Sequence, residues 1–273
     1  MSSSNTDKVF AGSVPKIYDE YLVPLIFEPY AVDLSQRLVV RPLGRVLEIA
    51  AGTGVVTRAL AYALPANVSI VATDLNQAML DQAAAIGTKR AVEWRQADAM
   101  QLPFEDNAYD AIVCQFGVMF FPDKIAGYRE AYRVLKPEGR FVFNVWDRIE
   151  RNEFCCLVND VVSSAFPNDP PQLMVRTPYG YNDPRLIVSE LEAAGFTVEA
   201  VEAVELQSEA PSAQELAIGF CQGSPLRSEI EARDPARLIE VTEAAADALL
   251  DRFGPGPISG AMRAYVITAI KHA

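Results

Sequence analysis

A short glycine-bearing segment follows the first strongly apolar stretch of the chain. The stretch is Arg45–Ala50, and the segment that comes after it reads Ala50-Ala51-Gly52-Thr53-Gly54. Glycine lets a backbone turn tightly and approach a ligand with no Cβ in the way. Where such a turn opens a helix, free N–H groups and the helix dipole favour a negatively charged group. The segment therefore indicates a ligand-binding loop or, more simply, a tight turn from strand to helix.

An aspartate ends the next apolar stretch, Val68–Asp74. A carboxylate at the end of a second strand can accept hydrogen bonds from both hydroxyls of a ribose. The simpler alternative is that Asp74 caps the following helix. Together, the loop and Asp74 indicate a cofactor that contains a nucleoside, either a nicotinamide dinucleotide or S-adenosylmethionine.

Three features distinguish these two cofactors. The dinucleotide pattern needs Gly or Ala at its sixth place, where this chain has Thr57. Glu48 lies inside the first strand, which is apolar throughout in dinucleotide-binding proteins. A second carboxylate, Asp98, closes the third apolar stretch just before Leu102-Pro103-Phe104. All three features disfavour a nicotinamide dinucleotide.

The elements that must position these residues form a regular alternation of short apolar runs and helical patterns. Strands are expected at 45–50, 68–74, 92–98, 109–116 and 140–146, and helices at 54–64, 77–86 and 124–135, with a turn at 137–139. Such alternation predicts a parallel sheet covered by helices. Right-handed crossovers make it an open, doubly wound, Rossmann-like sheet.

The rest of the chain is less regular. It predicts helices over 154–165, 184–194 and 234–253, and β segments at 196–206 and 264–270. The two β segments bring the α/β fold to a mostly parallel, seven-stranded sheet with helices on both faces and a helical cap. No linker is visible, so we expect a single domain. Its core is expected at about 39–147, 184–206 and 258–273, and its cap at 1–38, 150–183 and 207–257.

Charge and cysteine content exclude several classes of partner. The formal net charge of −12 and the sequence pI near 4.6 disfavour nucleic acid, which is bound largely through Lys and Arg. The four cysteines show neither metal-ligand nor disulfide spacing, so we expect reduced thiols, no metal and a cytoplasmic protein. No signal peptide or apolar run of membrane-spanning length is visible.

Five ordered motifs between Arg45 and Asp147 carry a family resemblance. They read VLEIAAGTG at 46–54, ATD at 72–74, QADAMQLPF at 96–104, YDAIVCQFGVMFFPD at 109–123 and YRVLKPEGRFVFNVW at 132–146. As a set they resemble the class I S-adenosylmethionine-dependent methyltransferases of the small-molecule type. The resemblance implies S-adenosylmethionine as the cofactor and a small molecule as the methyl acceptor.

The resemblance also implies roles around the first two strands. Glu48 would organise the methionine amine, and Asp74 would bind the ribose hydroxyls. The loop residues that would approach the methionine and ribose are Ala50, Gly52, Thr53 and Gly54. Ala50 departs from the family, which usually has Gly there. We therefore expect the turn to avoid a strongly left-handed conformation at this position.

Further roles follow at the next strand ends. Leu75 and Met79 would border the adenine. Asp98 would accept from its exocyclic amine, beside the backbone N–H of Ala99, although Asp98 could instead only cap a turn. The residues that would place the sulfonium-bearing side of the cofactor are Gln115 and Phe116.

Methyl transfer needs little from the protein beyond alignment, since the cofactor carries its own leaving group. Tyr18 could face the sulfonium cation, or simply pack in a helix. The chain has one histidine, His272, next to its last residue, so the sequence names no catalytic base. Apolar and aromatic segments at 11–38 and 152–181 suggest a lid over a partly apolar acceptor, or ordinary packing. Other chemistry on the same scaffold, or cofactor binding without catalysis, stays an alternative.

Overall fold

The computed structural model describes residues 12–39 and 42–272. They fall into two compact units, each described here by itself. One unit consists of residues up to 29, 146–181 and 205–263, and the other of residues 30–145, 182–204 and the chain from 264 onward. The predicted cap residues 1–11 lie outside the described ranges.

A seven-stranded sheet has the order β3-β2-β1-β4-β5-β7-β6. Its strands are β1 Arg45–Ile49, β2 Ser69–Asp74, β3 Glu93–Gln96, β4 Tyr109–Gln115, β5 Leu135–Trp146, β6 Thr197–Ala210 and β7 Ile258–Ile270. The first five pair in parallel. β7 runs antiparallel to β5, since Glu138 N–H donates to Lys271 O and Lys271 N–H donates to Gly139 O. The predicted Rossmann-like, mostly parallel sheet is confirmed.

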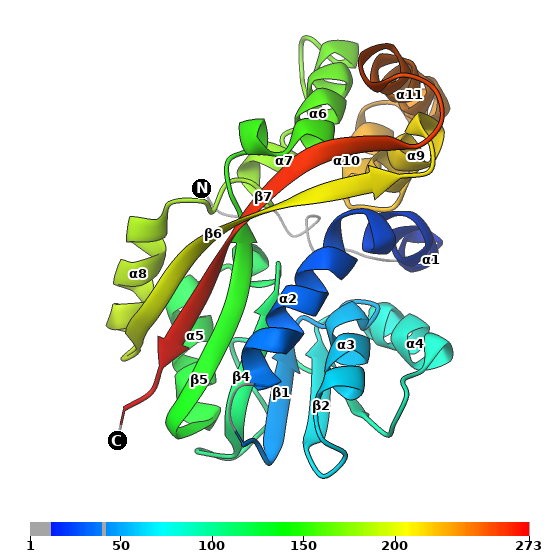
Figure 1. Ribbon diagram of the computed structural model, residues 1–273. Helices are drawn as coiled ribbons and strands as arrows, with labels where there is room; N and C mark the ends of the chain where they lie inside the picture. Colours follow the sequence, from blue (N-terminus) through cyan, green and yellow to red (C-terminus); the bar gives the residue numbers. More distant parts are fainter. Residues whose placement is uncertain (1–11, 40–41, 273) are drawn as a thin grey trace. The chain divides into compact units, whose positions relative to one another are not determined.

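Helices α2 (Glu28–Val39) and α3 (Val55–Ala63) cover one face of the sheet (Figure 1). Alternate strand residues point to this face because side chains alternate along a strand. The buried apolar core there includes Leu34 of α2 and Leu60 of α3, packed with Val46, Val113 and Val142 of the strands. This core packs α2 and α3 onto β1, β4 and β5.

Helix α5 (Lys124–Val134) packs on the opposite face of the same sheet, with α8 (Pro184–Ala193) beside it. The Tyr128 ring of α5 lies 6.1 Å from that of Phe141 and 5.7 Å from that of Phe143, both of β5. Helix α4 (Gln77–Ile86) contacts β2 and β3. The predicted helices on both faces are therefore present.

The other unit is largely helical. Its helices are α1 Val14–Ile17, a π-helix at Tyr18–Phe27, α6 Glu153–Ala165, α7 Leu173–Arg176, α9 Ala213–Gln222, α10 Leu226–Arg233 and α11 Leu238–Phe253. Helix α11 packs against α9 and α6. The role of this unit as a cap stays a prediction. In the described ranges no helix combines the length and apolar character needed to cross a membrane.

The predicted turn at 137–139 proved to lie inside β5. Glu138 has a φ of 61°, and the pairing with β4 shifts register between Tyr109 and Ala111. The strand therefore absorbs the turn as an irregularity, because β7 pairs with the backbone on both sides of it.

Candidate cofactor site

The loop after β1 turns through left-handed backbone at three positions. Ala50, Gly52 and Gly54 have φ angles of 55°, 55° and 83°. A Cβ added to Gly54 would lie 2.7 Å from Cη2 of Trp94, so a side chain there meets both backbone strain and a rigid ring. The loop thus delivers the chain into α3 in a conformation that glycine makes accessible.

The prediction about Ala50 was wrong. Its φ of 55° is left-handed, the conformation that the sequence led us to exclude there. Parallel pairing continues to Ile49, and the N–H of Ala51, two residues on, donates to Thr73 O at 2.9 Å, which leaves the turn to occur at Ala50. Left-handed backbone costs an L-residue about 1–2 kcal/mol relative to its right-handed counterpart. The hydrogen bonds of the surrounding sheet offset that cost.

We expect Ala50→Gly to raise the free energy of unfolding by about 1 kcal/mol, because glycine adopts positive φ without the Cβ penalty. Urea unfolding measures it. The matched control is Ala51→Gly next door, where φ is not positive and the added backbone freedom should lower stability. Equal losses in both variants would contradict the assigned strain.

Asp74 joins the end of β2 to the loop. Its Oδ2 accepts from Gly52 N at 2.9 Å, and its Oδ1 accepts from Asn76 N at 2.8 Å. The side chain is 8% exposed, and burial raises the pKa of Asp74 more than the hydrogen bonds from Asn76 and Gly52 lower it. The structure therefore brings together the two features, loop and aspartate, that the sequence singled out.

Glu48 is buried beneath the loop on the face covered by α3. Thr57 Oγ1 donates to Glu48 Oε2, and Thr73 Oγ1 donates to the backbone oxygen of Glu48. Burial raises the pKa of Glu48 to about 8, against the opposing effects of the Thr57 hydrogen bond and the Arg58 charge. Thr57, noted in the sequence only because it broke the dinucleotide pattern, is thus the side-chain partner of the carboxyl group.

The residues predicted around the adenine lie at the neighbouring strand ends. Leu75, which follows β2, is 46% exposed, whereas Met79 of α4 is buried. Asp98 is exposed, and its Oδ1 accepts from Met100 N at 2.9 Å, beside the half-buried Ala99. An exposed leucine next to a buried aspartate offers an apolar surface to a flat base. Through this bond to Met100 N, Asp98 also caps its own turn, which is the simpler role that the sequence left open.

The end of β4 also carries a left-handed residue. Phe116 has a φ of 49°, and its ring packs edge-on against Tyr30 of α2 at a centroid distance of 5.3 Å. Gly117 follows it, and a Cβ added there would lie 2.5 Å from Cβ of Ala50. The turn after Gln115 and Phe116 therefore packs directly against the glycine loop. The close approach at Gly117 was not predicted from the sequence.

Tyr18 belongs to the helical unit, where its ring stacks on Phe27 at 5.1 Å. Its predicted place beside the sulfonium stays a prediction.

The residues present fit a nucleoside cofactor with a polar amino-acid tail. Among the described residues, buried Thr53 Oγ1 and buried Asn144 Nδ2 have no protein hydrogen-bond partner. A buried polar atom without a partner costs about 1–3 kcal/mol, which a bound ligand's polar atoms can offset. Both atoms lie in the unit that carries the glycine loop, at the carboxyl ends of the strands where open α/β sheets bind ligands.

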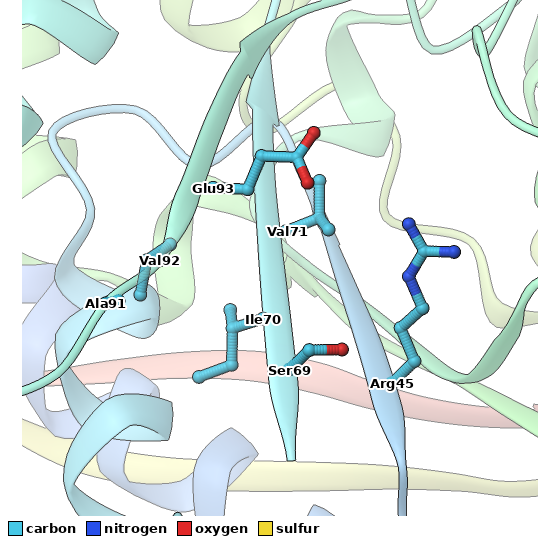
Figure 2. Close-up of a pocket in the computed structure, with 7 residues that line it drawn as sticks. All are labelled: Arg45, Ser69, Ile70, Val71, Ala91, Val92 and Glu93. Atoms are coloured by element: carbon cyan, nitrogen blue, oxygen red, sulfur yellow. The ribbon is translucent and has the colours of Figure 1, made fainter. Parts of the chain in front are cut away.

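A depression at the other end of the strands is distinct from this site (Figure 2). Its lining includes Arg45, Ser69 and Glu93, which are the first residues of β1, β2 and β3, together with Ile70, Val71, Ala91 and Val92. These are the amino ends of the strands, opposite the glycine loop. We assign it no role in cofactor binding.

Comparison with known proteins agrees with the geometry. A family model described as a methyltransferase domain matches residues 47–143. The ubiquinone/menaquinone biosynthesis C-methyltransferase UbiE of Pseudomonas fluorescens is 36% identical over 121 residues, which are 43% of this chain and 46% of that one. The chain thus spans about half the length of the curated relatives it matches.

Solved structures share the fold at low identity. One is a phosphoethanolamine N-methyltransferase of Haemonchus contortus in complex with S-adenosylhomocysteine, with a TM-score of 0.58, 15% identity, and coverage of 95% of this chain and 57% of that one. Another is the [4+2]-cyclase SpnF, with a TM-score of 0.56, 20% identity, and coverage of 90% and 81%.

Proposed function

We propose that this chain, whose residues 47–143 match a methyltransferase domain, is a class I S-adenosylmethionine-dependent methyltransferase that transfers the methyl group to a small, partly apolar molecule. The observation that carries this proposal is the buried Asp74 carboxylate, hydrogen-bonded to Gly52 of the loop. It lies at the carboxyl end of β2, where a ribose would be bound.

The predicted roles of the site residues form part of the proposal. Asp74 would accept from the ribose hydroxyls, and Leu75 would cover one side of the adenine. Thr53 Oγ1, buried and without a protein partner in the described ranges, would bond a polar atom of the methionine part. Glu48 would lie near the methionine amine, and the turn at Gln115–Phe116 would border the sulfonium.

The cofactor, when bound, supplies a methyl group on a good leaving group, so the chain's own task is alignment. Holding two reactants in an attack geometry can contribute about 7–11 kcal/mol. His272 does not serve as a base here, because its Nδ1 lies 3.6 Å from Glu138 Oε1, near the amino end of β5 and away from the loop. We propose that the acceptor reacts as a lone-pair donor or already deprotonated.

The helical unit supports a partly apolar acceptor. Aromatic rings gather at the end of β5, where Trp146 stacks on Tyr179 at 5.8 Å and lies 6.2 Å from Phe27. A net charge of −12 disfavours nucleic acid as the substrate. On its thiol content we propose that the protein works in the cytoplasm.

Calorimetric titration of the purified chain with S-adenosylmethionine, S-adenosylhomocysteine and NAD tests the proposal. We expect micromolar binding of the first two and none of NAD. Absence of binding by both adenosyl ligands would refute the proposed site. Transfer of isotope-labelled methyl to a panel of small quinones, phenols and amines then tests catalysis. Binding without transfer to any of them would favour other chemistry on this fold, which the cyclase SpnF illustrates.

A further inference from the structure

A single asparagine interrupts the apolar end of β5. In the run from Phe141 to Trp146, Asn144 is the one side chain that is not a hydrocarbon or an aromatic ring, and it is fully buried. Register places it beside Gln115, the last residue of β4. It therefore lies at the edge of the sheet that carries the glycine loop, although no motif in the sequence drew attention to it.

The orientation of the Asn144 carboxamide is determined by one hydrogen bond. Phe116 N–H donates to Asn144 Oδ1 at 2.9 Å, so the oxygen must lie on that side. The same N–H also reaches the backbone oxygen of Asn144 at 3.2 Å. The amide hydrogen of Phe116 is thus shared between two oxygens of Asn144, of which the side-chain oxygen is the closer, and Asn144 Nδ2 has no protein partner in the described part of the chain.

Burying this carboxamide is a cost for folding. An unpaired buried donor costs about 1–3 kcal/mol, and an apolar residue of the same size would avoid that cost. Among its neighbours along β5, Phe143 and Val145 are wholly buried hydrocarbon. Stability alone therefore does not account for an asparagine at this place.

Asn144 is connected to the cofactor loop by a short series of contacts. It bonds Phe116, whose φ is 49°, and Gly117 follows directly. Gly117 packs so closely on Ala50 that an added Cβ would lie 2.5 Å from Cβ of Ala50, whose φ is 55°. The glycine that follows left-handed Phe116 thus packs on left-handed Ala50, and the two turns lie side by side at neighbouring strand ends. Such backbone persists only where its surroundings enforce it, and it gathers at functional sites.

We propose that Asn144 is a positioning residue for cofactor binding. Its Oδ1 fixes the left-handed turn at Phe116, and through Gly117 that turn fixes the glycine loop at Ala50. Asn144 thereby sets the affinity for the adenosyl cofactor through the shape of the loop. This inference rests on the proposed cofactor site.

Two substitutions of Asn144 distinguish an effect on the loop from an effect on stability. The variant that should be the more stable should bind the cofactor more weakly, and the less stable variant should bind it normally. Asn144→Leu keeps the volume and removes the oxygen, so it should fold at least as stably as the wild type. Asn144→Asp keeps an oxygen at the Oδ1 position but buries an ionisable group, so it should be the less stable variant. Ser35→Ala is the matched control. It removes a buried polar group of the same unit, a hydroxyl that donates to Val32 O and lies outside the site.

We expect Asn144→Leu to bind S-adenosylhomocysteine at least fivefold more weakly than the wild type by calorimetry. Asn144→Asp and Ser35→Ala should bind within twofold of the wild type, while thermal unfolding ranks Asn144→Asp lowest. Affinity that simply follows the melting temperature, or unchanged affinity in Asn144→Leu, would overturn the proposal. A wild type that binds no S-adenosylhomocysteine would instead refute the proposed site itself.

Hydrogen exchange provides a readout that does not require Asn144→Asp to fold. Gly52 N–H is protected by its bond to Asp74 Oδ2, so its exchange rate reports the order of the loop. In Asn144→Leu this amide should exchange at least fivefold faster, while amides in the middle of β2 remain unchanged. Equal rates at Gly52 in wild type and variant would contradict the positioning role.

Discussion

Asp74→Ala should weaken binding of S-adenosylhomocysteine at least tenfold. Two losses combine: the ribose hydroxyls lose their acceptor, and Gly52 N–H loses the oxygen that it bonds at 2.9 Å. Loss of one hydrogen bond to a charged group costs about 1.5–3 kcal/mol, and about 1.4 kcal/mol is a factor of ten in affinity. Calorimetric titration measures the change directly.

The control for this variant is Asp81→Ala. Asp81 lies on the exposed side of α4, where it accepts from Gln77 Nε2 within the same helix. It should bind the ligand as the wild type does. Circular dichroism of both variants checks that the sheet is intact. An Asp74→Ala protein that is folded and binds normally would place the ribose somewhere else.

Glu48→Gln should change how stability depends on pH. Burial raises the pKa of Glu48 to about 8 in the folded protein, above its ordinary value of 4.5. Between those values the folded chain keeps a proton that the unfolded chain releases, so the free energy of unfolding falls as pH rises. The slope approaches about 1.4 kcal/mol per pH unit. Glutamine does not titrate, so its contribution to the free energy of unfolding does not change with pH.

Urea unfolding from pH 5 to pH 8.5 tests this expectation. The two proteins should be similar in stability near pH 5, and the Glu48→Gln protein should be the more stable at pH 8.5. Glu93→Gln, at the exposed start of β3, is the matched control and should follow the wild-type curve. If the plots of unfolding free energy against pH were parallel for wild type and Glu48→Gln, Glu48 would have the same pKa in the folded and the unfolded chain.

Groups from three other elements face Glu48, and none of them reverses the upward shift of its pKa. Thr57 and Arg58 on α3 lower its pKa, while the nearby charge of Asp74 on β2 raises it. Cys114 on β4 also lies within electrostatic range of Glu48. Because burial is the largest influence, the free energy of unfolding is expected to fall with pH rather than rise.

Regular segments of this fold could be predicted because their signals are local. The helix expected at 77–86 is found with those bounds, since apolar periodicity is bounded there by Asn76 and Gly87. By contrast, α9 and α10 were not predicted as separate helices. Both are short, and α9 packs on the π-helix at Tyr18–Phe27, far away along the chain, which a local pattern cannot report.

In the site, too, features with a local signal could be predicted, and features that depend on contacts between distant segments could not. The sequence led to Asp74 and the loop, which the structure joins by a hydrogen bond. It led to the wrong backbone at Ala50, because the rarity of left-handed alanine was weighed without the sheet that enforces it. Asn144 escaped notice because one amide in an apolar strand becomes informative only once Phe116 is seen beside it.

The strand order has a consequence for synthesis of the chain on the ribosome. β7 is the last strand made, yet it lies between β5 and β6. Until residues 258–270 emerge, β5 has no partner on one side, and the 14-residue β6 has no neighbour at all. Unpaired strand edges promote association between nascent chains. Slow translation between β6 and β7 should therefore raise aggregation, and a chaperone that shields β6 should lower it.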